Sequence, residues 1–209
     1  MLTRTIFTVF AAAMVMSFGS TAAAKMANAP QAAIPDACKS HVLLAAMPLV
    51  QEIAGKAPLS MACTNFSIDM VWGENGDSIR IQLVDARGTL GDTPPRLAEM
   101  ARDMPLRAAQ TALSAADEVR KVVLSEPALL DQYGGPDFLP VVDIGPTGLH
   151  YTIDIDRQGD GGSARGLIGH VQNRYAVKID MDETKAIGAA AGRAAYAPWL
   201  NALRLTQLP

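Results

Sequence analysis

One acidic, glycine-rich stretch carries the residue types of a calcium site. It begins at Asp154 and reads DIDRQGDGG. An EF-hand loop places oxygen ligands at positions 1, 3 and 5, glycine at 6 and glutamate at 12. Counting from Asp154 fills the first four of these positions, but position 12 is Arg165, and counting from Asp156 puts Leu167 there. We therefore interpret the stretch as a solvated hairpin loop. Weak calcium binding at 157–163 is a hypothesis that a calcium-dependent rise in melting temperature would support.

Two pairs of carboxylates, Asp154/Asp156 and Asp180/Asp182, have a spacing that could serve acid–base chemistry. Residues i and i+2 of a strand face the same side, roughly 7 Å apart. That separation could suit the paired carboxylates of a glycosidase. It is equally typical of the solvated face of an antiparallel sheet, which is the interpretation we favour.

Three histidines, His41, His150 and His170, are the other side chains that could act in catalysis or bind a metal. Zinc needs three or four converging ligands, and the sequence has no H-x-x-x-H pair and no Cys/His cluster. It has no G-x-S-x-G elbow, Walker loop or dinucleotide fingerprint either, although a Ser-His-Asp triad assembles only in the fold. The sequence thus predicts no metal site and no cofactor, and it identifies no catalytic residue.

Alternation of polar and apolar residues predicts that one sheet face in the second half of the chain is polar. Its members are His150, Thr152, Asp154, His170, Lys178 and Asp180. An open polar face can receive a protein partner or another ligand, and it is our candidate binding face. A merely solvated surface is the stronger expectation from the sequence.

Cys38 and Cys63 are the two cysteines of the chain. In an exported protein such a pair usually forms a disulfide. The bridge would close a loop of about 26 residues, which contributes roughly 3.5 kcal/mol on the loop-entropy treatment. Redox pairs usually have the close C-x-x-C spacing, so we expect a structural bridge rather than a redox dithiol or a pair of metal ligands.

The first 24 residues have the features of a cleaved signal peptide. Arg4 precedes an apolar stretch at 6–18, which is shorter than the roughly 20 residues that span a bilayer. Ala22 and Ala24 supply the small-x-small pattern of a cleavage site, so we expect the cut after Ala24. The alternative is an uncleaved N-terminal anchor. Cleavage predicts a periplasmic or secreted protein with no stable membrane anchor.

Removal of residues 1–24 leaves 185 of the 209 residues, which suits one domain with a real core. We expect a flexible lead-in at 25–35 and a single domain at 36–209. The formal net charge is −3, and it becomes −4 when the signal takes Arg4 with it. This balance argues against nucleic acid as a partner and against a polybasic membrane-binding patch.

Hydrophobic periodicity predicts the elements that must position these residues. We expect a helix at 38–54 with a kink or break at Pro48, a hairpin of strands 64–72 and 79–83, and a helix from Asp92 to about 124 bent or split at Pro105. After it we expect a loop at 125–137 with room for one turn of helix, strands near 138–144, 149–155, 164–171 and 175–181, and a helix from Asp182 to about 197. The apolar seam of the long helix is expected to face the sheet. It consists of Leu97, Ala101, Met104, Ala108, Ala112, Ala115, Val119 and Val122.

Short turns between the strands predict antiparallel pairing, and too few helices interrupt them for a doubly wound sheet. We therefore predict an α+β fold: an antiparallel sheet of about five to six strands with helices packed on one face, in the order α-ββ-α(α)-βββ(β)-α. The predicted function is that of an exported, non-enzymatic protein-binding domain. An inhibitor, an immunity protein or an envelope-assembly accessory protein that binds another protein of the cell envelope would fit. The alternative is a small exported hydrolase that uses carboxylate or histidine residues of the second β region.

Overall fold

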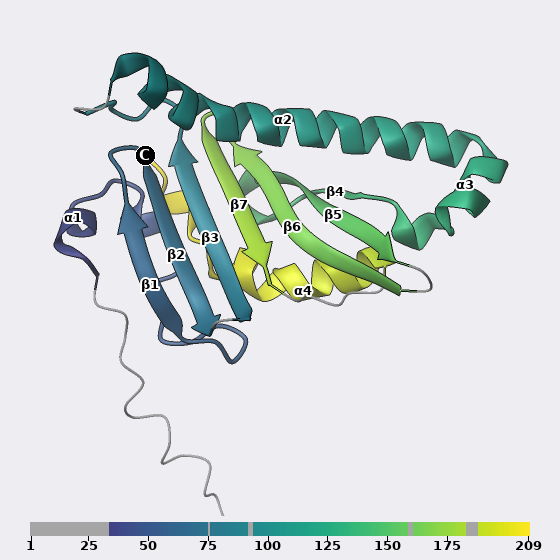
Figure 1. The fold of residues 1–209 in the computed structure, drawn as a ribbon, viewed down its shortest axis with the longest axis horizontal. Helices are drawn as coiled ribbons and strands as arrows, with labels where there is room; N and C mark the ends of the chain where they lie inside the picture. The colour runs from purple at the N-terminus through teal and green to yellow at the C-terminus, as the bar shows by residue number, and fades with distance from the viewer. Residues whose placement is uncertain (1–33, 75, 92–93, 159–160, 183–187) are drawn as a thin grey trace, which may run out of the picture.

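A computed structural model describes residues 34–209 except 75, 92–93, 159–160 and 183–187. The predicted signal peptide and most of the lead-in lie outside the described residues. The centre of the fold is one antiparallel sheet in the order β1-β2-β3-β7-β6-β5-β4 (Figure 1). Its strands are β1 (Pro58–Cys63), β2 (Ser67–Glu74), β3 (Asp77–Asp85), β4 (Val141–Ile144), β5 (His150–Gln158), β6 (Gly161–Val171) and β7 (Tyr175–Met181). The predicted α+β class is confirmed.

The helical elements of the described residues fall before, between and after the strands. They are α1 (Asp36–Lys39), η1 (Leu44–Ala46), α2 (Pro95–Ser125), α3 (Pro127–Tyr133), η2 (Pro136–Phe138), η3 (Pro146–Gly148), α4 (Gly188–Ala202) and η4 (Leu205–Gln207). No helix among these residues is both long enough and apolar enough to cross a membrane.

The sheet has seven strands rather than the predicted five to six, because β1 adds an edge strand beside β2. Its sequence, PLSMAC, contains no β-branched or aromatic residue, and most of its side chains are at least partly exposed. An edge strand needs less apolar alternation than a central strand, so periodicity did not reveal it. The hairpin of β2 and β3 was predicted correctly, and Trp72 pairs with Ile79 across it.

The main core lies between one face of the sheet and α4. Apolar residues of β2, β3, β7, β6 and β5 fill it, as alternation predicts. Trp199 of α4 meets Trp72 edge-on, with ring centroids 5.8 Å apart. At Gly192 an added Cβ would lie 2.9 Å from Cδ1 of Ile155. The glycine therefore lets the helix backbone approach the sheet closely.

The prediction that the helices pack on one face is corrected, because α2 crosses the opposite face from α4 (Figure 1). Met104 and Ala108 of α2 line one groove together with Gln82 and Lys178. These strand residues alternate with core residues, so they point away from α4. The second face can accept a helix because Val84 and Ala176 provide small or apolar contact among its polar residues; both are buried.

Proline affects α2 less than its position suggested, and the N-terminal segment is less helical than its periodicity suggested. The helix α2 runs through Pro105 without a break. Arg102 before the proline donates to the Gly88 carbonyl (3.2 Å), and Arg120 beyond it donates to the Pro140 carbonyl (3.0 Å). These bonds hold α2 on the molecule on both sides of Pro105. The predicted helix at 38–54, in contrast, is reduced to α1 and η1.

Two further boundaries differ from the prediction. The loop expected at 125–137, with one turn of helix at most, contains the seven-residue helix α3, which ends at Gly134 with a positive φ of 90°. The last helix continues through Pro198 to Ala202. Its predicted start at Asp182 and Glu183 borders residues 183–187, which lie outside the described residues.

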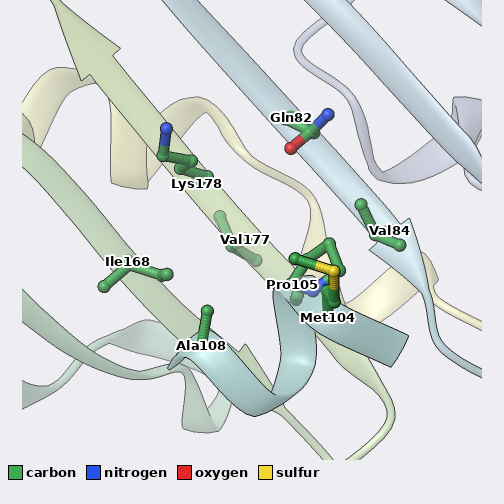
Figure 2. A pocket seen from close by; sticks show the side chains of 9 residues that line it. Gln82, Val84, Met104, Pro105, Ala108, Ile168, Val177 and Lys178 are labelled. Atoms are coloured by element: carbon green, nitrogen blue, oxygen red, sulfur yellow. The ribbon is translucent and has the colours of Figure 1, made fainter. Parts of the chain in front are cut away.

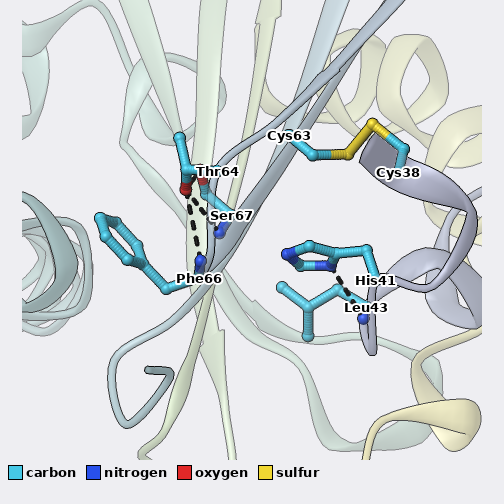
Figure 3. Close-up of a disulfide and its surroundings, with 7 residues drawn as sticks. All are labelled: Cys38, His41, Leu43, Cys63, Thr64, Phe66 and Ser67. Carbon is cyan, nitrogen blue, oxygen red and sulfur yellow. Dashed lines mark hydrogen bonds between the residues drawn. A yellow bond between two sulfur atoms is a disulfide. The ribbon is translucent and has the colours of Figure 1, made fainter. Parts of the chain in front are cut away.

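The predicted disulfide between Cys38 and Cys63 is present, with the Cα atoms 5.6 Å apart (Figure 3). It ties the short helix α1 to the end of β1. Cys38 is fully buried. The N-terminal segment before β1 has little regular structure of its own. The bridge therefore holds this segment against the sheet.

Candidate binding surface

An exposed apolar strip on α2 is the feature that best marks a functional surface. We call it the α2 seam. It consists of the eight residues predicted to face the sheet, and all are exposed except Ala112 and Val119, which are partly exposed. The seam does not face the sheet. The helix α2 is rotated about its axis relative to the predicted orientation, so that its buried residues are Ala98, Ala109, Ala116 and Val123. The seam lies to one side, and Leu97 and Met104 are 61% and 59% exposed. Large contiguous apolar patches on a soluble domain usually mark interaction sites.

A groove of about 210 Å³ lies where the α2 seam meets the sheet (Figure 2). Met104, Pro105 and Ala108 form its helix wall, and Ile168 is part of its floor. Most of the wall is apolar, and the side chains of Gln82 and Lys178 supply the polar contacts. The seam and the groove are continuous through Met104 and Ala108.

The six residues of the predicted binding face do lie on one side of the sheet, in three neighbouring rows. Thr152, Ile168 and Lys178 are aligned across β5, β6 and β7. Gly166 separates Asp154 from Asp180 in the next row, and His150 is aligned with His170. The helix α2 crosses this face, so it is less open than the sequence suggested. Thr152 is buried and cannot contact a partner directly.

Charges on the uncovered part of this face form ion pairs. Arg80 donates from Nε to Oδ1 of Asp69 at 2.9 Å, and Lys178 lies 2.9 Å from Asp180. The hydrogen bond and the charge of Asp69 raise the pKa of Arg80 above its ordinary value. The Arg80 and Lys178 side chains are 55% and 49% exposed, whereas that of Asp69 is 18% exposed. Asp180, which pairs with Lys178, is 41% exposed, so cations and carboxylates are both accessible beside the groove.

The two histidines of the face stack on each other. The rings of His150 and His170 are 5.6 Å apart and nearly parallel. Burial lowers the pKa of His170, and the charge of His150 lowers it further. Nδ1 of His170 is buried and has no hydrogen-bond partner among the described residues. Parallel stacked rings do not converge on one point, so this pair does not form a chelating site.

Sequence reasoning missed a second, polar cavity of about 410 Å³ beside the disulfide. Asp85 is buried there and accepts two hydrogen bonds from Arg174, at 2.8 and 2.6 Å. Burial raises the pKa of Asp85, but the bonds from Arg174 and the Arg87 amide outweigh it, so the pKa is lowered overall. Asp85 lies beyond the predicted strand 79–83, and nothing in the sequence indicated its partner 89 residues away.

His41 also lines this polar cavity. Its Nδ1 accepts the Leu43 amide at 3.2 Å (Figure 3), so the proton of the neutral ring is on Nε2. Burial lowers the pKa of His41; the backbone of Thr64 and the charge of Asp85 raise it by less. Nε2 is itself buried and lacks a hydrogen bond of ordinary geometry among the described residues.

Metal binding finds no support among the described residues, which contain no group of three His, Cys, Asp or Glu side chains able to hold an ion. The calcium hypothesis for 157–163 is not tested by this observation, because Gly159 and Asp160 lie outside the described residues.

Comparisons with protein-family models, with curated proteins and with solved structures find no match for this chain.

Proposed function

We propose that this chain is an exported, non-enzymatic protein-binding domain that binds another protein of the cell envelope through the α2 seam and the adjoining sheet face. The observation that carries the proposal is the exposure of large apolar side chains on successive turns of α2. Met100 extends the exposed surface of Leu97 and Met104, at 51% exposed. Methionine side chains adapt to differently shaped partners and are common at binding surfaces.

The groove supports a protein ligand more than a small molecule. Its volume of about 210 Å³ is below the roughly 300–1,000 Å³ of most small-molecule sites. The apolar seam runs along α2 well beyond the groove, from Leu97 to Val122. A protein can cover the seam and the groove together.

Export is supported by the Cys38–Cys63 bridge and by the signal peptide predicted at residues 1–24. Disulfides persist in oxidising compartments and are rare in the cytosol. Mass spectrometry of natively produced protein tests this part of the proposal. A chain that begins at Lys25 and has no free thiol is the expected result, and a chain that keeps Met1 and two free thiols contradicts it.

Site-specific photo-crosslinking in the native envelope tests the binding surface. We expect p-benzoylphenylalanine at Met104 or Ala108 to give a discrete adduct, because both residues line the groove. The same probe at Gln110, which is exposed on the solvent side of α2, should give none. Leu97→Glu should abolish the adducts at Met104 and Ala108, because it places a charge on the seam. Equal labelling at Gln110, or no adduct at the seam, contradicts the proposal.

The hydrolase alternative makes a separate prediction. If His150 or Asp154 acts in catalysis, His150→Ala or Asp154→Ala abolishes a measured turnover and leaves the crosslinks at the seam unchanged. The stacking of His150 on His170 gives it a structural role instead, and we expect these variants to retain binding.

A further inference from the structure

We propose that the polar cavity beside the disulfide is a binding site for a small organic carboxylate, held by the guanidinium groups of Arg87 and Arg174. The cavity is separate from the α2 seam, and the inference does not depend on the proposed protein-binding function. Three properties of the cavity support it: its preformed walls, its unpaired hydrogen-bond donors and the charge of its lining.

Three segments of the chain, together with Arg174, form the walls of the cavity. The disulfide ties residues 37–42 to the end of β1, and residues 64–65 belong to the turn between β1 and β2. Residues 85–89 lie at the end of β3, where the Arg87 amide donates to Oδ1 of Asp85 at 2.9 Å. The volume of about 410 Å³ is within the roughly 300–1,000 Å³ of most small-molecule sites.

Arg174 lines the cavity and has one edge of its guanidinium without a partner. Nε and Nη2 donate to the two carboxylate oxygens of Asp85, at 2.8 and 2.6 Å. A guanidinium has five N–H groups, and the edge formed by Nη1 and the second N–H of Nη2 has no hydrogen bond with the described residues. The side chain is 30% exposed, so a ligand can reach it. A carboxylate can accept two parallel hydrogen bonds from such an edge.

The other polar groups of the lining also offer donors. Arg87 is exposed, and its side chain forms no ion pair and no hydrogen bond with the described residues. The hydroxyl groups of Ser40 and Thr89 line the cavity and have no hydrogen bond among the same residues. The carboxylate of Asp85, in contrast, already accepts three hydrogen bonds from Arg174 and the Arg87 amide. The cavity therefore favours a ligand that accepts hydrogen bonds.

The charge of the lining favours an anion with a single charge. The described lining residues include two arginines and one aspartate, which leaves a formal charge of +1. Two charged pairs border the lining and are balanced in themselves: Lys39 with Asp36 at 2.6 Å, and Arg102 with Asp103 at 2.9 Å. A carboxylate, with one negative charge, matches this surplus better than a phosphate dianion does.

Nuclear magnetic resonance titration of the mature chain, residues 25–209, tests this inference. The probes are butyrate, butanamide as its neutral analogue of the same shape, and inorganic phosphate. The signals followed are the Nε–H of Arg174 and the backbone amides of Gly88 and Thr89, which all belong to the lining. We expect butyrate to give saturable shifts, phosphate to bind at least about tenfold more weakly, and butanamide to give no saturable shift.

Three arginine substitutions provide the matched comparison, followed through the amides of Gly88 and Thr89. Arg87→Gln should weaken butyrate binding about tenfold, because it removes a charge-assisted hydrogen bond. Arg174→Lys keeps the charge but lacks the two parallel N–H groups, and should weaken binding by a similar factor. Arg107→Gln removes the same charge from an exposed residue of α2 and should leave the affinity unchanged. Circular dichroism confirms that the variants are folded.

Several outcomes would overturn the inference. They are the absence of saturable shifts with butyrate, equal binding of butyrate and butanamide, tighter binding of phosphate, and an affinity that Arg87→Gln does not change. Met104→Glu on the α2 seam should leave butyrate binding intact, so the cavity and the seam are tested separately. Failure of the crosslinks at the seam contradicts the protein-binding function alone, and failure of butyrate binding contradicts the carboxylate site alone.

Discussion

Arg174 and Asp85 show how one buried pair can connect distant parts of this chain. Two hydrogen bonds join the guanidinium to the carboxylate, and the Arg174 guanidinium carbon also lies 4.7 Å from the centre of the Tyr175 ring. The side chain of Asp85 is 3% exposed, so its carboxylate depends on Arg174 and on the Arg87 amide for its hydrogen bonds. The pair therefore links the end of β3 to the turn before β7.

We predict that Arg174→Ala lowers the free energy of unfolding by about 2–3 kcal/mol, because it leaves a buried carboxylate unpaired. Urea denaturation measures the change. Arg80→Ala is the control, since its pair with Asp69 is largely exposed and should contribute less than about 1 kcal/mol. Equal losses in the two variants would contradict the assigned role of Asp85.

The same pair predicts a response to acid. The pKa of Asp85 is below its ordinary value of 3.8 in the folded protein, so its stabilising effect is complete above that pH. The effect is lost as the pH falls through the folded-state value. Between about pH 5 and pH 2, Arg174→Ala should therefore lose less stability than the parent chain, as followed by urea midpoints.

His170 predicts a separate dependence near neutral pH. Its folded-state pKa is lowered from 6.5, so the unfolded chain binds more protons just below that value and stability rises with pH there. We expect the free energy of unfolding to fall between about pH 7.5 and 5.5, and His170→Gln to reduce the fall. Some dependence should remain because burial also lowers the pKa of His41. An unchanged slope in His170→Gln would contradict this assignment.

At the scale of elements, the rotation of α2 decides which of its residues are available for binding. Ala109 is fully buried, while its neighbour Ala108 is exposed on the seam. Both residues are alanines, so residue type cannot predict which of the two is buried. The two positions differ only by the 100° step of the helix.

This pair allows a matched test of the orientation of α2. Ala109→Leu should cost about 1–3 kcal/mol, because it forces extra volume between the helix and the sheet. Ala108→Leu should change the stability by less than about 0.5 kcal/mol. Thermal or urea unfolding compares them. If Ala108→Leu is the more destabilising, the seam faces the protein rather than solvent.

At the scale of the whole molecule, the disulfide attaches the N-terminal segment, which has little regular structure, to the end of β1. We predict that the double substitution Cys38→Ser and Cys63→Ser lowers the free energy of unfolding by roughly 3 kcal/mol, as expected for a loop of this size. Reduction of the parent chain by dithiothreitol should give the same loss. A far smaller loss in both cases would show that the N-terminal segment is held by other contacts, such as the buried Leu43 and Met47.

The sequence by itself determined much of the architecture. Alternation in β2, β3, β5 and β7 follows from the two-residue repeat of a strand, and the alternating residues of these strands form the core as predicted. Two cysteines in a chain with a predicted signal peptide led to the correct bridge. The placement of His150, His170 and Lys178 on one face also follows from alternation and turn length, which are local properties.

Only the tertiary structure decided which face each helix covers and which apolar residues remain exposed. The apolar arc of α2 is wider than the strip that the sheet can bury, so periodicity alone selected Leu97 and Met104, whereas packing buried Ala98 and Ala109. The pairing of Asp85 with Arg174 joins residues far apart in the chain, which no local pattern encodes. The surface available to a partner is what remains exposed after these long-range contacts are made, and for that reason it was visible only in the folded molecule.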